Sequence, residues 1–353
     1  MAFRHKIAVI FGGKKRLKKY ADFVLYVEKN SYLCNIILQA QKKRINLIFI
    51  LLTLISMVHT FKDWIETTRY WSFSVSAFPV LATAAYLCAT YGFAEVSLLN
   101  TLLAVVGAVL FHAAGNLLSD VGDYKSGADS PEAFAVRNLI EHRFECKEYL
   151  RLSAVLFILG ILVGLFLTWR CGWELLIIGG LGFLFTLLYT KSKNVLMSDL
   201  DIFVIFGIII VLGTSFVATG RVCFDTLLLS IPLGIITLSV LHANNTLDIK
   251  TDQAVGIRTI AIALGAEKSA KLYIAYQIIP FAWVALCVIF GLMPWTALLS
   301  LVAFAAALGN IRQASKFKTV GIEAMKGLDL CSAKLQLIFS LTLSIGLFIA
   351  AFF

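Results

Sequence analysis

The sequence predicts an all-α, polytopic membrane protein in which about nine transmembrane helices form a bundle around a central cavity. Apolar residues make up 59% of the 353 residues and charged residues only 15%, and the mean hydropathy is +0.86. A soluble chain of this length needs far more charged surface. Nine apolar stretches have roughly the 20-residue length of a membrane span, and their continuous character favours helices over a membrane barrel. The nine stretches cover about residues 74–92, 97–118, 150–169, 174–190, 200–219, 227–246, 272–291, 295–309 and 335–353.

Basic residues are distributed unevenly along the chain. Residues 1–73 contain 13 Lys and Arg against 4 Asp and Glu, whereas the remainder contains 18 against 17. A basic segment that adjoins a span indicates an anionic lipid surface and not a nucleic-acid partner. With a cytoplasmic N-terminus, only Arg170 and Arg221 of the later 18 basic residues fall on the far side. This bias predicts a multi-pass protein of the cell (inner) membrane whose N-terminus and active-site loops face the cytoplasm.

Two regions are expected, a basic N-terminal appendage over residues 1–60 and a membrane domain over residues 61–353. The apolar stretch Ile45–Val58 has 14 residues, which is short for a span, and it lies too far along the chain for a signal peptide. It is either an interfacial helix or sequence upstream of the true start, because Met57 shortly precedes the first firm span. Neither interpretation gives the appendage a catalytic task.

The second span ends in a cluster of polar side chains. Asn116, Asp120 and Asp123 are at offsets of zero, four and seven residues, so on a helix they share one face. Carboxylates at a membrane helix end are costly unless they are paired, solvated or bound to metal. The cluster is therefore a candidate functional site.

The sixth span ends in a similar cluster. Asn244, Asp248 and Asp252 are at offsets of zero, four and eight residues, and Asn245 lies about a quarter-turn away. Oxygen ligands of this kind suit hard cations, with Mg²⁺ usual where phosphates complete the shell. No Cys or His accompanies the clusters, which argues against zinc. Basic residues that could bind an anion such as a diphosphate lie nearby: Lys125, Arg137, Lys191, Lys193, Lys250 and Arg258.

Three other interpretations of these charged residues are possible. The charges could simply cap helices and solvate loops, although two matched clusters on one membrane side disfavour this. A cation-coupled transporter would place its carboxylates near the midplane of broken helices and not at helix ends. A CDP-alcohol phosphotransferase would carry a compact Asp/Gly/Arg signature, which is absent. His112 and His242 precede the clusters closely, but a lone helical histidine is more often a packed one.

Residues 116–129 (NLLSDVGDYKSGAD) and 244–265 (NNTLDIKTDQAVGIRTIAIALG) resemble the paired signatures of the UbiA superfamily of intramembrane prenyltransferases. The resemblance covers about residues 62–353. It is greatest to the 1,4-dihydroxy-2-naphthoate polyprenyltransferases of menaquinone biosynthesis, because Asp and Gly follow Asn116 at the spacing of that branch. The Arg-Thr-x-x-Arg-Pro element of the benzoate- and haem-type branches is absent from residues 130–138.

The resemblance implies a Mg²⁺-dependent transfer of a polyprenyl chain from a polyprenyl diphosphate to an aromatic acceptor, within the lipid bilayer and without nucleic acid. The acceptor it favours is the dihydroxynaphthoate, with loss of carbon dioxide; another aromatic or lipid acceptor is the alternative. The implied catalytic carboxylates are Asp120, Asp123, Asp248 and Asp252, which also bind metal with Asn116 and Asn244. The implied diphosphate-binding residues are Lys125, Arg137, Tyr189, Lys193, Asn245 and Arg258.

Overall fold

The computed structural model describes residues 59–127, 138–192 and 196–353. The chain divides into two compact units, Met1–Trp64 and Ile65–Phe353. The predicted appendage, residues 1–60, lies outside the described residues except for its last two. The fold below is that of the second unit.

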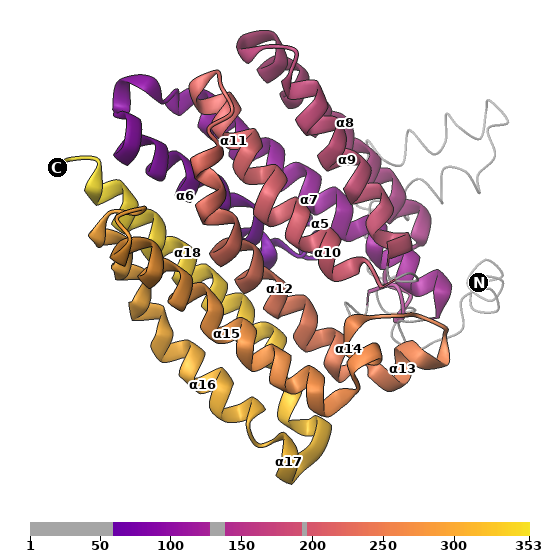
Figure 1. Cartoon of the computed structure of the whole chain (residues 1–353). Coiled ribbons are helices and arrows are strands. Elements are labelled where there is room, and N and C mark those ends of the chain that lie inside the picture. The colour runs from indigo at the N-terminus through magenta and orange to yellow at the C-terminus, as the bar shows by residue number, and fades with distance from the viewer. Residues whose placement is uncertain (1–58, 128–137, 193–195) are drawn as a thin grey trace, which may run out of the picture. The chain divides into compact units, whose positions relative to one another are not determined.

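Every described element is a helix, which confirms the predicted fold class (Figure 1). Within the described ranges, eight helical segments are long and apolar enough to cross a membrane. Some of these segments are single helices and others join several helical elements end to end. The eight are Tyr70–Tyr91, Leu98–Ser126, Cys146–Cys171, Ser198–Thr219, Phe224–Leu247, Ala266–Ile289, Trp295–Met325 and Leu328–Ala350. Their main elements are α6 (Ser74–Tyr91), α7 (Leu98–Ser126), α8 (Cys146–Cys171), α10 (Ser198–Phe203), α11 (Ile210–Thr219), α12 (Ser230–Leu247), α15 (Ala266–Ile289), η6 (Trp295–Ala303), α16 (Phe304–Ala314) and α18 (Leu328–Ala350).

The remaining predicted span is also helical but shorter. It forms α9 (Leu175–Ser192), whose apolar part is Leu175–Tyr189. Two short helices complete the parts used below: α13 (Ile249–Ala254) and α14 (Ile260–Leu264).

Helix α12 occupies the middle of the bundle (Figure 1). It packs against α15 and α18 on one side and against α10 and the π-helical turn Val204–Ile209 on the other. The main core lies between α12, α15 and α18, where the ring of Phe281 contacts those of Phe304 and Phe339 at centroid distances of 5.0 and 5.1 Å. Edge-to-face aromatic contacts of this kind stabilise a core beyond the area they bury.

Close approach at two glycines fixes the helix spacing. A Cβ at Gly207, in the π-helical turn, would lie 3.3 Å from the Cα of Gly234 on α12. A Cβ at Gly346, on α18, would collide with the carbonyl oxygen of Thr296. Small residues allow membrane helices to pack with their backbones in contact. The Gly207–Gly234 contact packs the π-helical turn against the first turns of α12, whereas the second polar cluster lies at the other end of α12.

Candidate functional site

The first cluster lies on the last turns of α7. The predicted span ends at residue 118, but the helix continues to Ser126 and ends at Gly127, whose φ of 78° suits a left-handed cap. Asn116, Asp120 and Asp123 are therefore all helical and share one face. Ser119 donates a hydrogen bond of 3.4 Å to Asp123 Oδ2, while Lys125 is exposed at the end of the helix.

Asp120 forms an ion pair with Arg69. The carboxylate is 3% exposed, and a buried charge requires compensation. Arg69 supplies it from a left-handed backbone conformation, φ 57° and ψ 48°. For a residue with a side chain, this conformation costs about 1 kcal/mol and is concentrated at functional sites.

The turn that carries Arg69 also holds Asn116. Asn116 Nδ2 donates to the carbonyl oxygen of Thr68 at 3.1 Å and to Ser72 Oγ at 3.2 Å. The segment 68–72 therefore covers the first cluster and fixes the amide with its Oδ1 available for another partner. Sequence reasoning did not select Arg69, because the ion pair joins residues 51 positions apart, which local spacing cannot reveal.

The second cluster lies where α12 meets α13. The backbone changes direction at Asp248, with φ −91° and ψ 11°, so Asn244 lies on α12 and Asp252 on α13 and not on one continuous helix. The hydrogen bonds Asp248 N to Asn244 O and Asp252 N to Asp248 O, both 2.9 Å, are nevertheless retained. The spacing of four residues is thus kept, and Asp248 and Asp252 are both half-buried.

The Gly-x-Arg-Thr segment that follows turns the chain into α14. Gly256 has a φ of 78°, and Thr259 caps α14 by accepting a hydrogen bond of 3.3 Å from Ile262 N. Arg258, between them, is exposed.

The two clusters lie at the same end of the bundle. A Cβ at Gly127, directly after the first cluster, would lie 3.9 Å from Val255 Cγ1, shortly after the second. Figure 1 shows α13 and α14 at this end. Two segments about 128 residues apart in sequence are therefore neighbours in space.

A buried polar network missed by sequence reasoning supports the second cluster. Asp199, on α10, is 2% exposed. Its Oδ1 accepts a 3.4 Å hydrogen bond from Asn245 Nδ2, and its Oδ2 lies 3.5 Å from His242 Nδ1. His242 Nε2 in turn lies 2.9 Å from Ser269 Oγ, which is 2.6 Å from Thr246 Oγ1. The network ties α10, α12 and α15 together and fixes the side chain of Asn245.

The sequence did contain a signal for this network. Asp199 and Asp201 lie two residues apart on a short helix that leads directly into an apolar span, and both are 2% exposed. Buried carboxylates at the end of a span deserve the same functional hypothesis as the two clusters. His112, by contrast, is a packed histidine: its Nδ1 lies 3.1 Å from Ser76 Oγ, and its ring contacts that of Phe206.

The other predicted residues are placed as follows. Tyr189 is half-buried on α9. Arg137 and Lys193 lie outside the described residues. Among the residues that the structure does describe, no group of three or more His, Cys, Asp or Glu side chains is close enough to hold a metal ion. The oxygen donors come as pairs of carboxylates with neighbouring amides, a set that suits a hard cation whose shell is completed by ligand oxygens.

The UbiA prenyltransferase family model matches residues 76–319. The chain belongs to the UbiA prenyltransferase family. The matched residues include both polar clusters, the Asp199 network and most of the bundle. The match confirms the family predicted from the two signatures.

Curated relatives are found in animals. UbiA prenyltransferase domain-containing protein 1 of Xenopus tropicalis is 32% identical over 226 residues, 62% of this chain and 64% of that protein. Its homologue in Drosophila melanogaster is 33% identical over 239 residues, 65% of each chain. The chain thus spans slightly less than two thirds of the length of these relatives. The finer assignment to the naphthoate branch stays a prediction.

Solved structures share the fold. A UbiA homologue from Aeropyrum pernix K1 has a TM-score of 0.61 at 17% identity, covering 80% of this chain and 98% of that one. A homologue from Archaeoglobus fulgidus bound to GPP and Mg²⁺ has a TM-score of 0.54 at 11% identity, covering 80% and 99%. The bundle is therefore that of the UbiA fold.

Proposed function

We propose that this chain is an intramembrane prenyltransferase that transfers a polyprenyl chain from an allylic polyprenyl diphosphate to an aromatic acceptor. The observation that carries the proposal is that two carboxylate clusters of a UbiA-family chain meet at one end of the bundle, at Gly127 and Val255. That end combines oxygen ligands with the exposed cations Lys125 and Arg258. Acidic, amide and basic groups together match the needs of a metal-bound diphosphate.

The residues fit a Mg²⁺ site. Asp120 is buried and already requires a positive partner, which is Arg69 in this structure. A UbiA homologue of the same fold binds GPP with Mg²⁺. The residues that would hold the cations here are Asp120 and Asp123 with Asn116, and Asp248 and Asp252 with Asn244.

Bound Mg²⁺ would supply positive charge that stabilises the diphosphate leaving group. The protein's own groups add to this stabilisation. Lys125 and Arg258 are exposed at the cluster end, where they would neutralise the outer diphosphate oxygens, with Arg137, Tyr189 and Lys193 as further expected contacts. Asn245 is held in place by Asp199 and would donate to a phosphate oxygen only after leaving that partner, or through its second amide hydrogen.

The allylic carbon–oxygen bond would break with its electron pair remaining on the diphosphate. The resulting allyl cation would form a carbon–carbon bond with an electron-rich ring carbon of the acceptor. With 1,4-dihydroxy-2-naphthoate, the ring carboxylate would leave as carbon dioxide, and its bonding electrons would restore the aromatic ring. The apolar bundle would exclude water that would otherwise capture the cation.

We propose 1,4-dihydroxy-2-naphthoate as the acceptor, which would place the chain in menaquinone biosynthesis. The support is the spacing of Asp and Gly after Asn116 and the absence of Arg-Thr-x-x-Arg-Pro from residues 130–138. We further propose that the clusters and the N-terminus face the cytoplasm, with the chain in the cell membrane. Another aromatic or lipid acceptor is the alternative within the family.

Competition between acceptors tests the proposal. Purified protein receives one polyprenyl diphosphate, Mg²⁺ and equal amounts of the naphthoate, 4-hydroxybenzoate and homogentisate, and products are identified by mass. A prenylated, decarboxylated naphthoate is expected, together with released pyrophosphate. A dominant benzoate or homogentisate product would overturn the acceptor alone. Intact donor with every acceptor would overturn the prenyltransferase proposal and leave a cation-coupled transporter as the next hypothesis.

A further inference from the structure

The guanidinium of Arg69 lies on the carboxylate of Asp120, where a metal ion is expected. In this ion pair the side chain of Arg69 is 30% exposed and that of Asp120 only 4%. The carboxylate therefore has little surface of its own through which a cation can approach. Two positive charges on one carboxylate also repel each other. A metal ion that binds Asp120 consequently competes with Arg69 for it.

The backbone that carries Arg69 is fixed by contacts other than this ion pair. Ser72 N and Ser72 Oγ both donate to the carbonyl oxygen of Arg69, at 2.8 and 2.7 Å. Asn116 Nδ2 donates to Thr68 O at 3.1 Å and to Ser72 Oγ at 3.2 Å. None of these bonds involves the guanidinium. Arg69 can therefore leave Asp120 by rotation of its flexible side chain while the turn stays in place.

A diphosphate bound to the same cation would offer Arg69 the nearest new partner. Mg²⁺ binds its oxygen ligands at about 2.1 Å in an octahedron, so two neighbouring ligands lie about 3 Å apart. A phosphate oxygen next to Asp120 in that shell would lie about 3 Å from the carboxylate oxygen that Arg69 contacts. A guanidinium binds a phosphate and a carboxylate with the same paired hydrogen bonds. A small rotation would thus exchange one anion for the other.

This exchange would couple the two ligands of the site. Mg²⁺ alone would displace Arg69 and leave two cations close together. Mg²⁺ that binds with a diphosphate brings the anion to which Arg69 can move. We infer that Arg69 competes with Mg²⁺ for Asp120 and transfers to the donor diphosphate, so that Mg²⁺ and the donor bind cooperatively. The inference rests on the proposed function, because it takes the donor to be a prenyl diphosphate.

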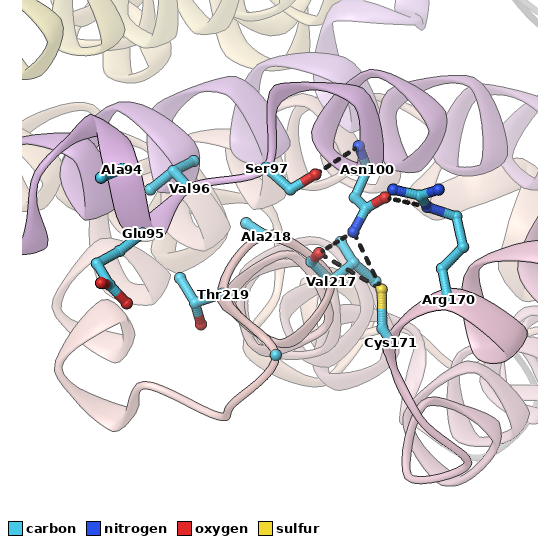
Figure 2. Close-up of a pocket in the computed structure, with 11 residues that line it drawn as sticks. Ala94, Glu95, Val96, Ser97, Asn100, Arg170, Cys171, Val217, Ala218 and Thr219 are labelled. Carbon is cyan, nitrogen blue, oxygen red and sulfur yellow. Dashed lines mark hydrogen bonds between the residues drawn. The ribbon is translucent and has the colours of Figure 1, made fainter.

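Arg170 provides a matched arginine at the other end of α7. Its Nε donates to Asn100 Oδ1 at 2.7 Å (Figure 2). At 1.5 Å per residue, Asn100 lies about 30 Å from Asp120 along α7. Asn100 is a neutral amide, whose Nδ2 donates to Val217 O at 3.0 Å. Arg170 thus joins a neighbouring segment to α7, as Arg69 does, but through a group that does not attract a metal ion.

Isothermal titration calorimetry of the full-length protein in detergent tests the inference. Mg²⁺ binding is measured with and without geranyl thiolodiphosphate, a donor analogue whose carbon–sulfur bond resists ionisation. The values are corrected for the complex that Mg²⁺ forms with the analogue in solution. We expect the wild type to bind Mg²⁺ at least about tenfold more tightly when the analogue is present, a coupling within the range typical of linked sites.

Arg69→Gln should change the two affinities in opposite directions. Without the competing guanidinium, Mg²⁺ alone should bind about tenfold more tightly than to the wild type. The analogue, at saturating Mg²⁺, should bind about tenfold more weakly, the effect of one lost charge-assisted hydrogen bond. Arg69→Lys keeps the charge but not the planar fork, so it should give smaller changes in the same directions. Arg170→Gln should match the wild type.

A residue that only supported the shape of the site would give a different pattern. Arg69→Gln would then bind both Mg²⁺ and the analogue more weakly, and this result would overturn the inference. An unchanged affinity of this variant for Mg²⁺ alone, with normal cooperativity, would overturn it as well. Both results would leave the proposed function intact. If the wild type bound no analogue even with Mg²⁺, the proposed function would be wrong, and the inference with it.

Discussion

Arg69 lies against Asp120, so a guanidinium from the turn before α6 neutralises the first carboxylate that the resemblance assigns to metal binding. The two residues belong to segments 51 positions apart. A cation that binds Asp120 must share this carboxylate with Arg69 or displace it. The ion pair thus connects the charge of the site to the conformation of the turn that covers it.

Asp120→Asn and Asp248→Asn should each lower turnover about 100-fold or more, because each removes a charge that stabilises the leaving group. Folding should be retained, since the amide is isosteric. Steady-state prenylation and the thermal melting curve are measured together. Asp225→Asn is the control: Asp225 accepts hydrogen bonds from Tyr86 and Tyr91 and belongs to neither cluster. Near-normal turnover in either cluster variant would make that Asp a simple helix-end charge.

Arg69→Gln should destabilise the protein when metal is chelated, because it leaves the Asp120 carboxylate buried without the guanidinium. Arg69 is itself 30% exposed, so solvent reduces the effect to about 1 kcal/mol. The melting temperature with EDTA gives the measurement. Adding Asp120→Asn should restore most of the loss, because the double variant contains no uncompensated charge. A double variant as unstable as the sum of both single variants would contradict the coupling.

Asp199→Leu and Asn245→Leu should both weaken binding of the prenyl diphosphate. If Asp199 positions Asn245 for the diphosphate, each variant should raise the KM for the prenyl diphosphate about tenfold, the effect of one lost hydrogen bond to a charged group. The double variant should be little worse than either single one. Losses in kcat/KM that multiply in the double variant would indicate separate roles.

Gly346→Ala should lower stability, although alanine favours a helix more than glycine by about 1 kcal/mol. The added Cβ would collide with the Thr296 carbonyl oxygen and separate α18 from η6. Gly164→Ala is the control, because nothing lies within 4 Å of the corresponding Cβ. Melting temperatures in detergent should fall for the first variant and stay equal or rise for the second.

A chain that begins at Met57 should insert, fold and turn over like the full length. Both clusters, the Asp199 network and all eight described spans lie after this residue. Membrane fractionation and prenylation by the shortened chain are compared with those of the full length. Loss of either would give the basic segment a role in insertion or activity.

Continuous apolar runs were enough to predict the spans. A helix that crosses a membrane forms all its backbone hydrogen bonds within itself, so each run can be recognised without knowledge of its neighbours. All nine predicted stretches are helical in the structure, although α9 is shorter than a typical span. The second apolar stretch was predicted to end at about residue 118, and the helix that contains it continues through the charged residues until Gly127 permits the turn. Spacing likewise predicted that Asn116, Asp120 and Asp123 share one face.

The supporting contacts could not be predicted in the same way. Arg69 reaches Asp120, and Asp199 reaches Asn245 across 46 positions, only because separate helices pack together. The close approach of Gly207 to Gly234 likewise depends on a π-helical turn. No local pattern of apolar residues marks such a turn.

The length of α7 determines where the chemistry would occur in the bilayer. Its 29 residues extend about 44 Å, roughly 14 Å more than the hydrocarbon core. The excess would place the carboxylates in the headgroup layer, while the rest of the helix would span the hydrocarbon core. A donor lipid would therefore react in the orientation it already has as an amphiphile. Its ionic end would stay at the boundary between the two phases, and its isoprenoid tail would enter sideways from the same leaflet, with no need to cross the membrane.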